Sequence, residues 1–263
     1  MSLLTHSAEP VLRVGSERPP HAESRPAPDL SVVIPLRDEA ANVTPLLSEL
    51  RAALTTLGRT FEIVLVDDAS SDGTAEHIAV EAGRDRAIVS VRLEVNLGQS
   101  LALAAGFARA QGAIVVTLDG DLQNDPADLS QLLAALESVD VVSGVRTERH
   151  DRWTRRVASR IANSVRRAVL GDPCTDIGCA FKAYRREALE GLPMFVGVHR
   201  FLPALCVFRG ARYAEIPVRH RSRRSGLSKY GVGNRLGRGL RDLIGVRWLK
   251  TRLGRMPEPE DRS

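Results

Sequence analysis

The sequence predicts an α/β fold built on a doubly wound, mostly parallel sheet, and three features indicate it. Short, uncharged, β-branched runs alternate along the chain with stretches of helical period, which is the pattern of repeated βαβ units. Several of those runs end abruptly in carboxylates, at the point where an open α/β sheet places its ligand crevice. The length of 263 residues with 43% hydrophobic content suits one substantial core.

The main part of the chain begins with five predicted strands that alternate with four predicted helices. We expect strands at Leu30–Pro35, Phe61–Asp67, Ala87–Leu93, Ala113–Leu118 and Val139–Gly144. We expect helices at Val43–Leu57, Gly73–Ala82, Gln99–Ala110 and Pro126–Leu136. Beyond residue 150 the pattern changes to a helix, short strands that include Ala211–Val218, and a basic helix over Asn234–Lys250.

Composition divides the chain into three segments. Residues 1–29 hold five prolines among polar residues and lack an apolar period, so we expect a disordered leader. Residues 30–233 form the main domain, and residues 234–263 form a basic amphipathic helix and tail. No apolar run approaches the roughly 20 residues of a transmembrane helix, and the first residues lack the apolar core of a signal peptide. We therefore expect a cytoplasmic protein that at most lies on a membrane surface.

Charge is distributed unevenly around the overall net of +5. Residues 200–255 contain 15 Lys and Arg against two acidic residues, a local net of +13, so the remaining chain sums to −8. This basic quarter favours an anionic partner such as phosphate groups, an anionic membrane or nucleic acid. The cysteines Cys174, Cys179 and Cys206 suit buried thiols in a reducing compartment. A zinc site formed by the first two with His199 is the alternative.

The fourth predicted strand ends in Asp119-Gly-Asp121-Leu-Gln123. Two carboxylates so close in sequence repel each other, and a divalent cation stabilises such a pair. Carboxylate oxygens with an amide oxygen suit Mg²⁺ or Mn²⁺, which bridge to substrate phosphates. The alternative is a solvated turn that caps the next helix. The chain has no GxGxxG or GxxxxGK[ST] motif, so neither a dinucleotide oxidoreductase nor a P-loop enzyme is indicated.

The first two strands also end in polar clusters. Pro35 and Glu39 follow the first strand, and the adjacent Asp67 and Asp68 follow the second. Carboxylates at these places can accept hydrogen bonds from a nucleobase edge and from ribose hydroxyls. The nearby Asp72-Gly-Thr74 segment either joins such a site or forms a turn and helix cap.

Together these motifs resemble inverting family-two glycosyltransferases, in particular dolichyl-phosphate mannose synthase and bacterial polyprenyl-phosphate glycosyltransferases. The resemblance also rests on three later segments within residues 30–235, namely Ser159-Arg160…Ser164, Asp176–Tyr184 and Arg223…Ser228-Lys229-Tyr230-Gly231. It implies a GT-A-like (nucleotide-diphospho-sugar transferase) fold with C-terminal interfacial helices. It also implies a metal-dependent hexosyltransferase that uses a GDP- or UDP-linked sugar and Mg²⁺ or Mn²⁺.

The resemblance implies roles for individual residues on the donor side. Nucleotide contacts fall to Pro35, Glu39, Asp67, Asp68, Arg223, Ser228 and Lys229, the last three clamping the diphosphate. Catalytic and metal-binding roles fall to Asp119 and Asp121, with Gln123 as a further metal ligand. Gln99 stands where the family frequently has Lys, so it receives no role, and Leu36-Arg37 replaces the usual small-Tyr pair.

On the acceptor side the resemblance implies that Arg146, Arg160 and Ser164 bind a phosphate, while Asp176 is a catalytic base or an orienting group. Arg160 and Ser164, four residues apart, share one helix face. A lipid phosphate is already anionic, so it needs positioning more than deprotonation. We therefore expect transfer of a sugar to a polyprenyl phosphate, with transfer to a saccharide or protein hydroxyl as the alternative. Nucleic-acid binding by a non-enzymatic protein is disfavoured because aromatic residues make up only 4% of the chain.

The basic helix at Asn234–Lys250 carries an apolar stripe formed by Leu236, Leu240, Leu243, Ile244 and Trp248. A basic amphipathic helix with Trp suits a membrane interface. Packing of the stripe against the protein's own core is the equally weighted alternative. The first interpretation predicts a peripheral protein on the cytoplasmic face of the membrane.

Overall fold

The computed structural model describes residues 26–147, 163–222 and 235–254, with side chains in the last range from Arg241 onward. In the first half its elements are β1 (Leu30–Leu36), α1 (Ala40–Thr56), β2 (Phe61–Asp67), α2 (Thr74–Arg84), β3 (Ile88–Arg92), α3 (Gln99–Arg109) and β4 (Ile114–Thr117). The second half adds η1 (Pro126–Asp128), α4 (Leu129–Leu136), β5 (Val141–Arg146), β6 (Lys182–Arg185), α6 (Arg186–Leu189), η2 (Val198–Arg200), α7 (Leu202–Phe208), β7 (Tyr213–Val218) and α8 (Arg235–Lys250). Residues 163–170 are also helical. The expected leader lies largely outside the described residues.

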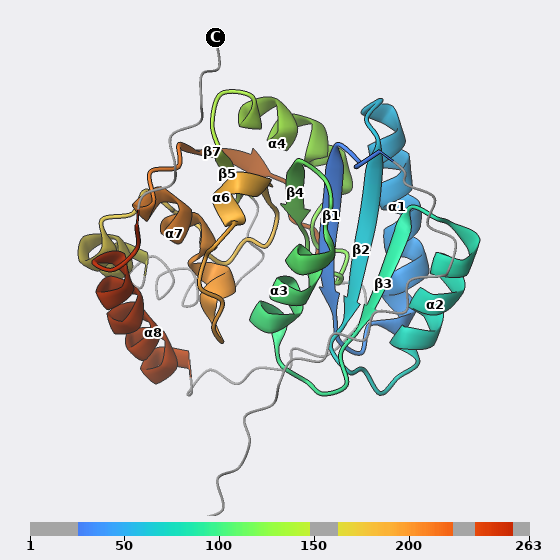
Figure 1. The fold of residues 1–263 in the computed structure, drawn as a ribbon, viewed down its shortest axis with the longest axis horizontal. Coiled ribbons are helices and arrows are strands. Elements are labelled where there is room, and N and C mark those ends of the chain that lie inside the picture. The colour runs from blue at the N-terminus through green and yellow to red at the C-terminus, as the bar shows by residue number, and fades with distance from the viewer. Residues whose placement is uncertain (1–25, 148–162, 223–234, 255–263) are drawn as a thin grey trace, which may run out of the picture.

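The strands form one seven-stranded sheet in the order β3-β2-β1-β4-β6-β5-β7 (Figure 1). All neighbours run parallel except β6, which lies antiparallel between β4 and β5. The predicted doubly wound, mostly parallel sheet is therefore confirmed. β2 and β3 lie on one side of β1 and β4 lies on the other, so the winding reverses between β1 and β4. Open α/β sheets bind their ligands at this reversal, beyond the carboxyl ends of the strands.

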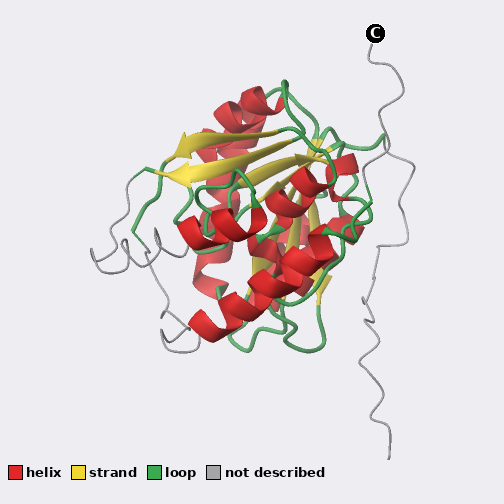
Figure 2. Cartoon of the chain, turned by 90° about the vertical axis from the view of Figure 1, so that its left-hand side faces the viewer, coloured by secondary structure: helices red, strands yellow, loops and turns green. Residues whose placement is uncertain are grey.

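Helices cover both faces of the sheet (Figure 2). On one face α1, α2 and α4 bury leucines and isoleucines such as Leu47, Leu132 and Ile78 against β1, β2 and β4. On the other face α3 packs against β1 and β2, and α7 and α8 pack around Tyr184 of β6. Because both faces are covered, the central strands are almost wholly apolar, as the β-branched runs indicate.

α1 begins at Ala40, three residues earlier than the sequence predicts. The reason lies in a distant loop. Asp72 Oδ2 accepts the Ala40 N–H at 3.0 Å, and Thr74 Oγ1 accepts the Glu39 N–H at 2.9 Å. Asp72 Oδ1 also accepts the Thr74 N–H at 3.1 Å. The Asp72-Gly-Thr74 segment therefore satisfies the first N–H groups of two helices, which is the capping alternative.

Of the predicted stripe on α8, the three residues with described side chains divide between core and surface, while the side chains of Leu236 and Leu240 lie outside the described part of the chain. Leu243 is 7% exposed and packs in the core under α7, whereas Ile244 and Trp248 are 63% and 61% exposed. Two α8 cations also hold the helical segment 163–170, because Arg247 and Lys250 donate to the carbonyl oxygens of Val169 and Leu170 at 2.6 and 2.5 Å. No helix among the described residues is long and apolar enough to cross a membrane.

Candidate active site

Three residues in left-handed backbone conformation mark the carboxyl ends of β1, β2 and β4. Asp38, Ala69 and Leu122 have φ angles of 48°, 55° and 61°, although none of them is glycine. Such conformations cost roughly 1–3 kcal/mol each and are kept where the surroundings impose them, most often at functional sites. They lie in the loops that carry the predicted donor-site residues, at the point where the sheet reverses its winding.

The Asp-Gly-Asp loop is held tightly against its neighbours. Gln99 at the start of α3 donates from Nε2 to Asp119 Oδ1 at 2.8 Å. A Cβ atom at Gly120 would lie 2.1 Å from the Leu36 side chain, so a larger residue between the two aspartates would have to displace that buried leucine. Asp121 is 8% exposed, and its Oδ1 accepts the Gln123 N–H at 3.2 Å. Both carboxylates therefore sit in fixed orientations beside β1.

The donor set of this loop fits a hard divalent cation. Asp119 and Asp121 supply two carboxylates, and Gln123 uses its Nε2 to donate to the Arg221 carbonyl oxygen at 3.3 Å. This leaves the Gln123 Oε1 atom as a potential ligand beside them. Oxygen ligands of this kind suit Mg²⁺ or Mn²⁺, which keep further positions for water and substrate phosphate.

The zinc alternative finds no support. Among the described residues no three His, Cys, Asp or Glu side chains gather as a metal cluster. Cys174, Cys179 and Cys206 are buried thiols outside any disulfide, as the sequence favours, and burial raises the pKa of Cys179 to about 11.

The loops after β1 and β2 are joined through the predicted nucleotide residues. Asp68 is 4% exposed and accepts the N–H groups of Leu97 and Gly98 at 2.7 and 2.9 Å. Burial outweighs these two hydrogen bonds and raises the pKa of Asp68. The buried Asp67 accepts the Ser70 N–H at 3.1 Å. Asp67 and Asp68 therefore accept hydrogen bonds from the loops that follow β2 and β3, and these loops border the site.

Pro35 and Glu39 lie at the carboxyl end of β1, beside the loops after β1 and β2. Pro35 is the penultimate residue of the strand, and Glu39 caps the start of α1, where its Oε2 accepts from Asn42 Nδ2 at 2.5 Å. Arg37 donates to the carbonyl oxygens of Asp68 and Ala69, which ties the two loops together. Of the predicted donor residues, Pro35, Glu39, Asp67 and Asp68 are therefore brought together with the Asp-Gly-Asp loop.

Two acceptor-side residues that the sequence treats separately form one ion pair. Arg146 at the end of β5 donates from Nε and Nη2 to the two carboxylate oxygens of Asp176, both at 2.8 Å. The side chains are 17% and 7% exposed, so the pair is largely desolvated. This geometry favours an orienting role for Asp176, because its two oxygens engage a guanidinium.

The exposed Ser164 lies near this pair. Its neighbour Asn163 donates from Nδ2 to the Thr175 carbonyl oxygen at 3.0 Å, one residue before Asp176. Buried Arg166 adds an ion pair with Asp172, which fastens the helical segment 163–170 to the 172–176 loop. The predicted phosphate-binding residue Ser164 is therefore attached to the loop that carries Asp176. Arg160, Arg223, Ser228 and Lys229 lie outside the described residues.

Three residues near this site received no donor or acceptor role from the sequence, and His199 was considered only as a zinc ligand. No role was assigned to Gln99 from the sequence. Its position at the start of a helix is the one sequence feature that could have suggested a contact with Asp119. Lys182 on β6 is 4% exposed; burial lowers its pKa, while Cys179 and the Asp119 carboxylate raise it. His199 lies with Nδ1 2.7 Å from Ser100 Oγ, and burial lowers its pKa to about 3, so the ring is neutral.

The family model described as Glycosyl transferase family 2 matches residues 31–192 of this chain. The chain belongs to glycosyltransferase family 2. It is 40% identical over 205 residues to the undecaprenyl-phosphate 4-deoxy-4-formamido-L-arabinose transferase of Edwardsiella ictaluri (strain 93-146). That alignment covers 77% of this chain and 63% of the relative, so the chain spans less than two thirds of the relative's length.

Solved structures confirm the GT-A-like fold. The glucosyl-3-phosphoglycerate synthase of Mycobacterium tuberculosis, in complex with Mn²⁺, uridine diphosphate and glucosyl-3-phosphoglycerate, superposes with a TM-score of 0.62 at 22% identity. The same enzyme with uridine diphosphate alone gives 0.63 at 23% identity. Each match covers 88% of this chain and 82% of the other.

Proposed function

We propose that this protein is an inverting glycosyltransferase that moves a sugar from a nucleotide-diphosphate donor to a polyprenyl phosphate. The observation that carries the proposal is the position of the Asp-Gly-Asp loop at the reversal between β1 and β4. The 40% identity to an undecaprenyl-phosphate transferase supports the choice of acceptor. The sugar, and the choice between UDP and GDP, depend on pocket shape.

The donor half of the site suits cleavage of a bond to a diphosphate. Pro35, Glu39, Asp67 and Asp68 surround the place proposed for the nucleoside, with the Asp-Gly-Asp loop beside it. Asp119, Asp121 and Gln123 would hold Mg²⁺ or Mn²⁺, which when bound offsets the charge of the leaving diphosphate. Gln99 holds Asp119 in place from α3, so that carboxylate is oriented before the donor arrives.

The acceptor half suits an anionic nucleophile. A phosphate monoester needs no general base at neutral pH, and the two hydrogen bonds from Arg146 to Asp176 support an orienting role for that carboxylate. Arg146 carries guanidinium charge to the end of β5, and Ser164 lies exposed on the attached helical segment. We propose that these two groups, with Arg160, orient the lipid phosphate for a single in-line displacement.

Nucleotide titration separates the donor proposal from the acceptor proposal. UDP or GDP with Mn²⁺ should raise the melting temperature, since saturation at a hundred times Kd adds roughly 2.7 kcal/mol of stability. Lys229→Ala should weaken this binding. Arg160→Ala should leave it intact and raise the apparent KM for polyprenyl phosphate.

The outcomes of that experiment distinguish the alternatives. No shift with either nucleotide would refute the donor assignment. Loss of nucleotide binding in Arg160→Ala would show that the division of basic residues is wrong. If Arg160→Ala transferred sugar normally while Asp176→Asn did not, a hydroxyl acceptor on a saccharide or protein would replace the lipid.

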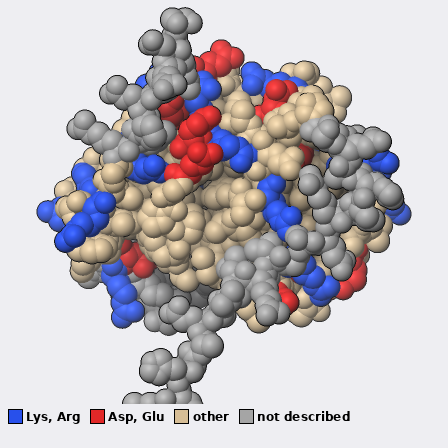
Figure 3. All heavy atoms as spheres, viewed as in Figure 1, with Lys and Arg blue, Asp and Glu red and all other residues tan. Residues whose placement is uncertain are grey.

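We also propose that the outer face of α8 rests on an anionic membrane surface, on the cytoplasmic side. Ile244 and Trp248 are exposed there, beside the exposed Arg241 and Arg247. Basic side chains lie along α8 at the left edge of the face in Figure 3. Val196, which is 70% exposed, adjoins this surface because Gly197 lies against Asp242 of α8. Apolar groups ringed by cations suit a lipid interface.

Ile244→Ala with Trp248→Ala should weaken sedimentation with phosphatidylserine-containing vesicles about tenfold or more, because burying each side chain is worth roughly 1.5–3 kcal/mol. Binding should also fall as salt rises. Val80→Ala with Val95→Ala is the matched control, since both residues are exposed elsewhere, at 51% and 55%. Equal binding by the two double variants would contradict the proposal. Leu243 is unsuitable for this test because it lies in the core.

A further inference from the structure

A short segment after β7 crosses from the edge of the sheet to the loop at residues 121–125 and on to α1. We call residues 219–221 the crossing segment. His220 forms an isolated bridge with Asn124, and Arg219 pairs with Asp128 at 2.8 Å and with Asp125 at 3.0 Å. The segment therefore runs directly behind the loop that carries Asp121 and Gln123.

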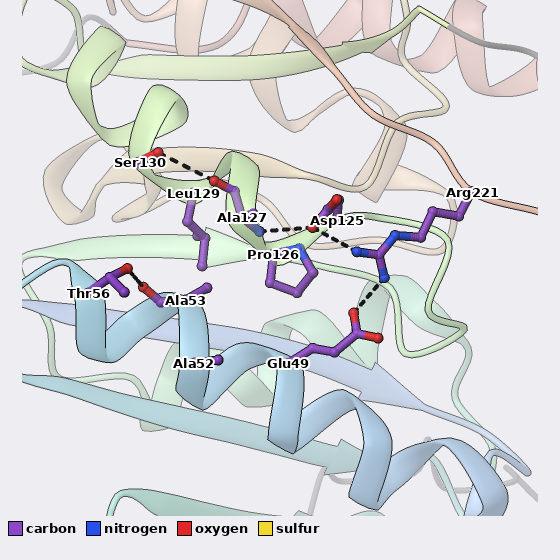
Figure 4. Close-up of a pocket in the computed structure, with 10 residues that line it drawn as sticks. All are labelled: Glu49, Ala52, Ala53, Thr56, Asp125, Pro126, Ala127, Leu129, Ser130 and Arg221. Atoms are coloured by element: carbon purple, nitrogen blue, oxygen red, sulfur yellow. Dashed lines mark hydrogen bonds and ion pairs between the residues drawn. The ribbon is translucent and has the colours of Figure 1, made fainter.

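Arg221, the last residue of the crossing segment, contacts both α1 and the loop that precedes η1. Its Nη1 lies 2.6 Å from Glu49 Oε2 on α1, and its Nη2 lies 2.9 Å from Asp125 Oδ1 (Figure 4). The Arg221 and Glu49 side chains are 34% and 26% exposed, and that of Asp125 is 10% exposed. One guanidinium thus joins two carboxylates on elements far apart in the sequence.

The Arg221 bridge spans a hollow. A pocket of about 380 Å³ lies between α1 and the start of α4, lined on opposite sides by Ala53 and Pro126. Figure 4 shows the guanidinium at the edge of this pocket, between Glu49 and Asp125. Ala52, Ala53 and Thr56 line the α1 side of the pocket beside Glu49. The ion-pair bridge adds a polar connection across the pocket to the apolar core that α1 shares with Leu122 and Leu129.

The backbone of Arg221 contacts Gln123 at two points. The Arg221 N–H donates to the Gln123 carbonyl oxygen at 2.7 Å, and Gln123 Nε2 donates to the Arg221 carbonyl oxygen at 3.3 Å. Arg221 therefore contacts both the carbonyl oxygen and the side-chain amide of Gln123, while Asp121 Oδ1 accepts the Gln123 N–H. Movement of Arg221 would turn the amide oxygen that we assign to the cation.

We propose that Arg221 is a positioning residue, which sets the Gln123 amide for metal binding through its bridge from Glu49 to Asp125. This inference rests on the proposed function, since it assigns Gln123 to the cation. Groups that orient metal ligands commonly change metal affinity 10- to 100-fold when removed. Arg219 keeps its own ion pairs in the absence of the Arg221 side chain, so the crossing segment stays attached and the fold survives.

Direct Mn²⁺ titration of the full chain tests the proposal without reference to turnover. Electron paramagnetic resonance of free Mn²⁺ gives the Kd in the presence of UDP or GDP, whichever binds the wild-type protein. Arg221→Met should raise this Kd about tenfold. Arg221→Lys keeps a charge but cannot bridge two carboxylates so well, and it should give an intermediate value.

Arg212→Met is the matched control. Arg212 stands one residue before β7, at the opposite end of that strand from the crossing segment, and it forms a similar two-point pair with Asp140, at 2.9 and 3.1 Å. Loss of either pair should lower Tm by at most roughly 2–4 °C, because both pairs are partly exposed. Only Arg221→Met should also weaken Mn²⁺ binding.

A double-mutant cycle completes the test. Glu49→Gln removes the charge that holds Arg221 on α1, and it should raise the Mn²⁺ Kd severalfold on its own. Combined with Arg221→Met it should add nothing further, because both changes break one bridge. Equal Mn²⁺ affinities in Arg221→Met and Arg212→Met would overturn the positioning role. Absence of Mn²⁺-dependent nucleotide binding in the wild-type protein would instead overturn the proposed function.

Discussion

Asp121→Ala should lower sugar transfer by about two orders of magnitude or more, which is the scale of one lost electrostatic contact to developing charge. Asp121 is buried at 8% exposure, beside Asp119 in the loop whose Gly120 packs closely against Leu36 of β1. Alanine removes a carboxylate from the proposed cation and the acceptor of the Gln123 N–H. Steady-state transfer at saturating Mn²⁺ measures the loss.

Asp121→Asn separates the two losses. The amide oxygen of asparagine can still accept the Gln123 N–H, so the loop keeps its turn while the negative charge disappears. If charge toward the cation is what matters, Asp121→Asn should be nearly as inactive as Asp121→Ala. Chelation offers an independent measurement, and full wild-type activity in excess EDTA would refute a metal-dependent reaction.

The central sheet could be predicted because its strands are buried on both faces. Runs such as Ile63–Val66 have no polar position to confuse the pattern, so strand and helix alternate plainly. β6 was not located from the sequence, although three of its four residues are buried. Its four residues, Lys182–Arg185, include a charged residue at each end, and its antiparallel place between β4 and β5 is set by distant partners.

The part of the candidate site that lies in one short stretch of sequence could be predicted. Asp119, Asp121 and Gln123 stand within five residues of one another at the end of a strand, so the sequence alone predicts a cation site there. Pairings between distant segments cannot be read in this way. Gln99 reaches Asp119 across 20 positions, and Arg146 reaches Asp176 across 30. Only folding brings such partners together.

The helix at the C-terminal end shows a further limit. Helical spacing placed Leu243, Ile244 and Trp248 on one stripe, yet the structure buries the first and exposes the other two. A stripe about 100° wide covers both a core-facing edge and an outer edge, and the sequence alone does not fix how the helix is rotated on its neighbours.

Arg146→Ala should both destabilise the protein and abolish use of the lipid acceptor. The Arg146–Asp176 pair is largely buried, and removal of one partner from such a pair costs about 3–5 kcal/mol. At roughly 2–4 °C per kcal/mol for a chain of this size, the melting temperature should fall by about 10 °C. A loss of sugar transfer in Arg146→Ala then has two explanations, a lost contact with the acceptor or a partly unfolded enzyme.

Arg146→Met with Asp176→Leu resolves that ambiguity. Replacement of a buried ion pair by apolar groups of similar volume is commonly neutral or stabilising, so the double variant should recover most of the lost melting temperature. It should still bind nucleotide with Mn²⁺, because the pair lies on β5 and the 172–176 loop rather than at β1 and β4. Transfer to polyprenyl phosphate should stay at least about a hundredfold below wild type, since the guanidinium is the group that orients the anionic nucleophile. Recovery of transfer together with stability would mean that this ion pair only holds the fold and that the acceptor phosphate is bound elsewhere.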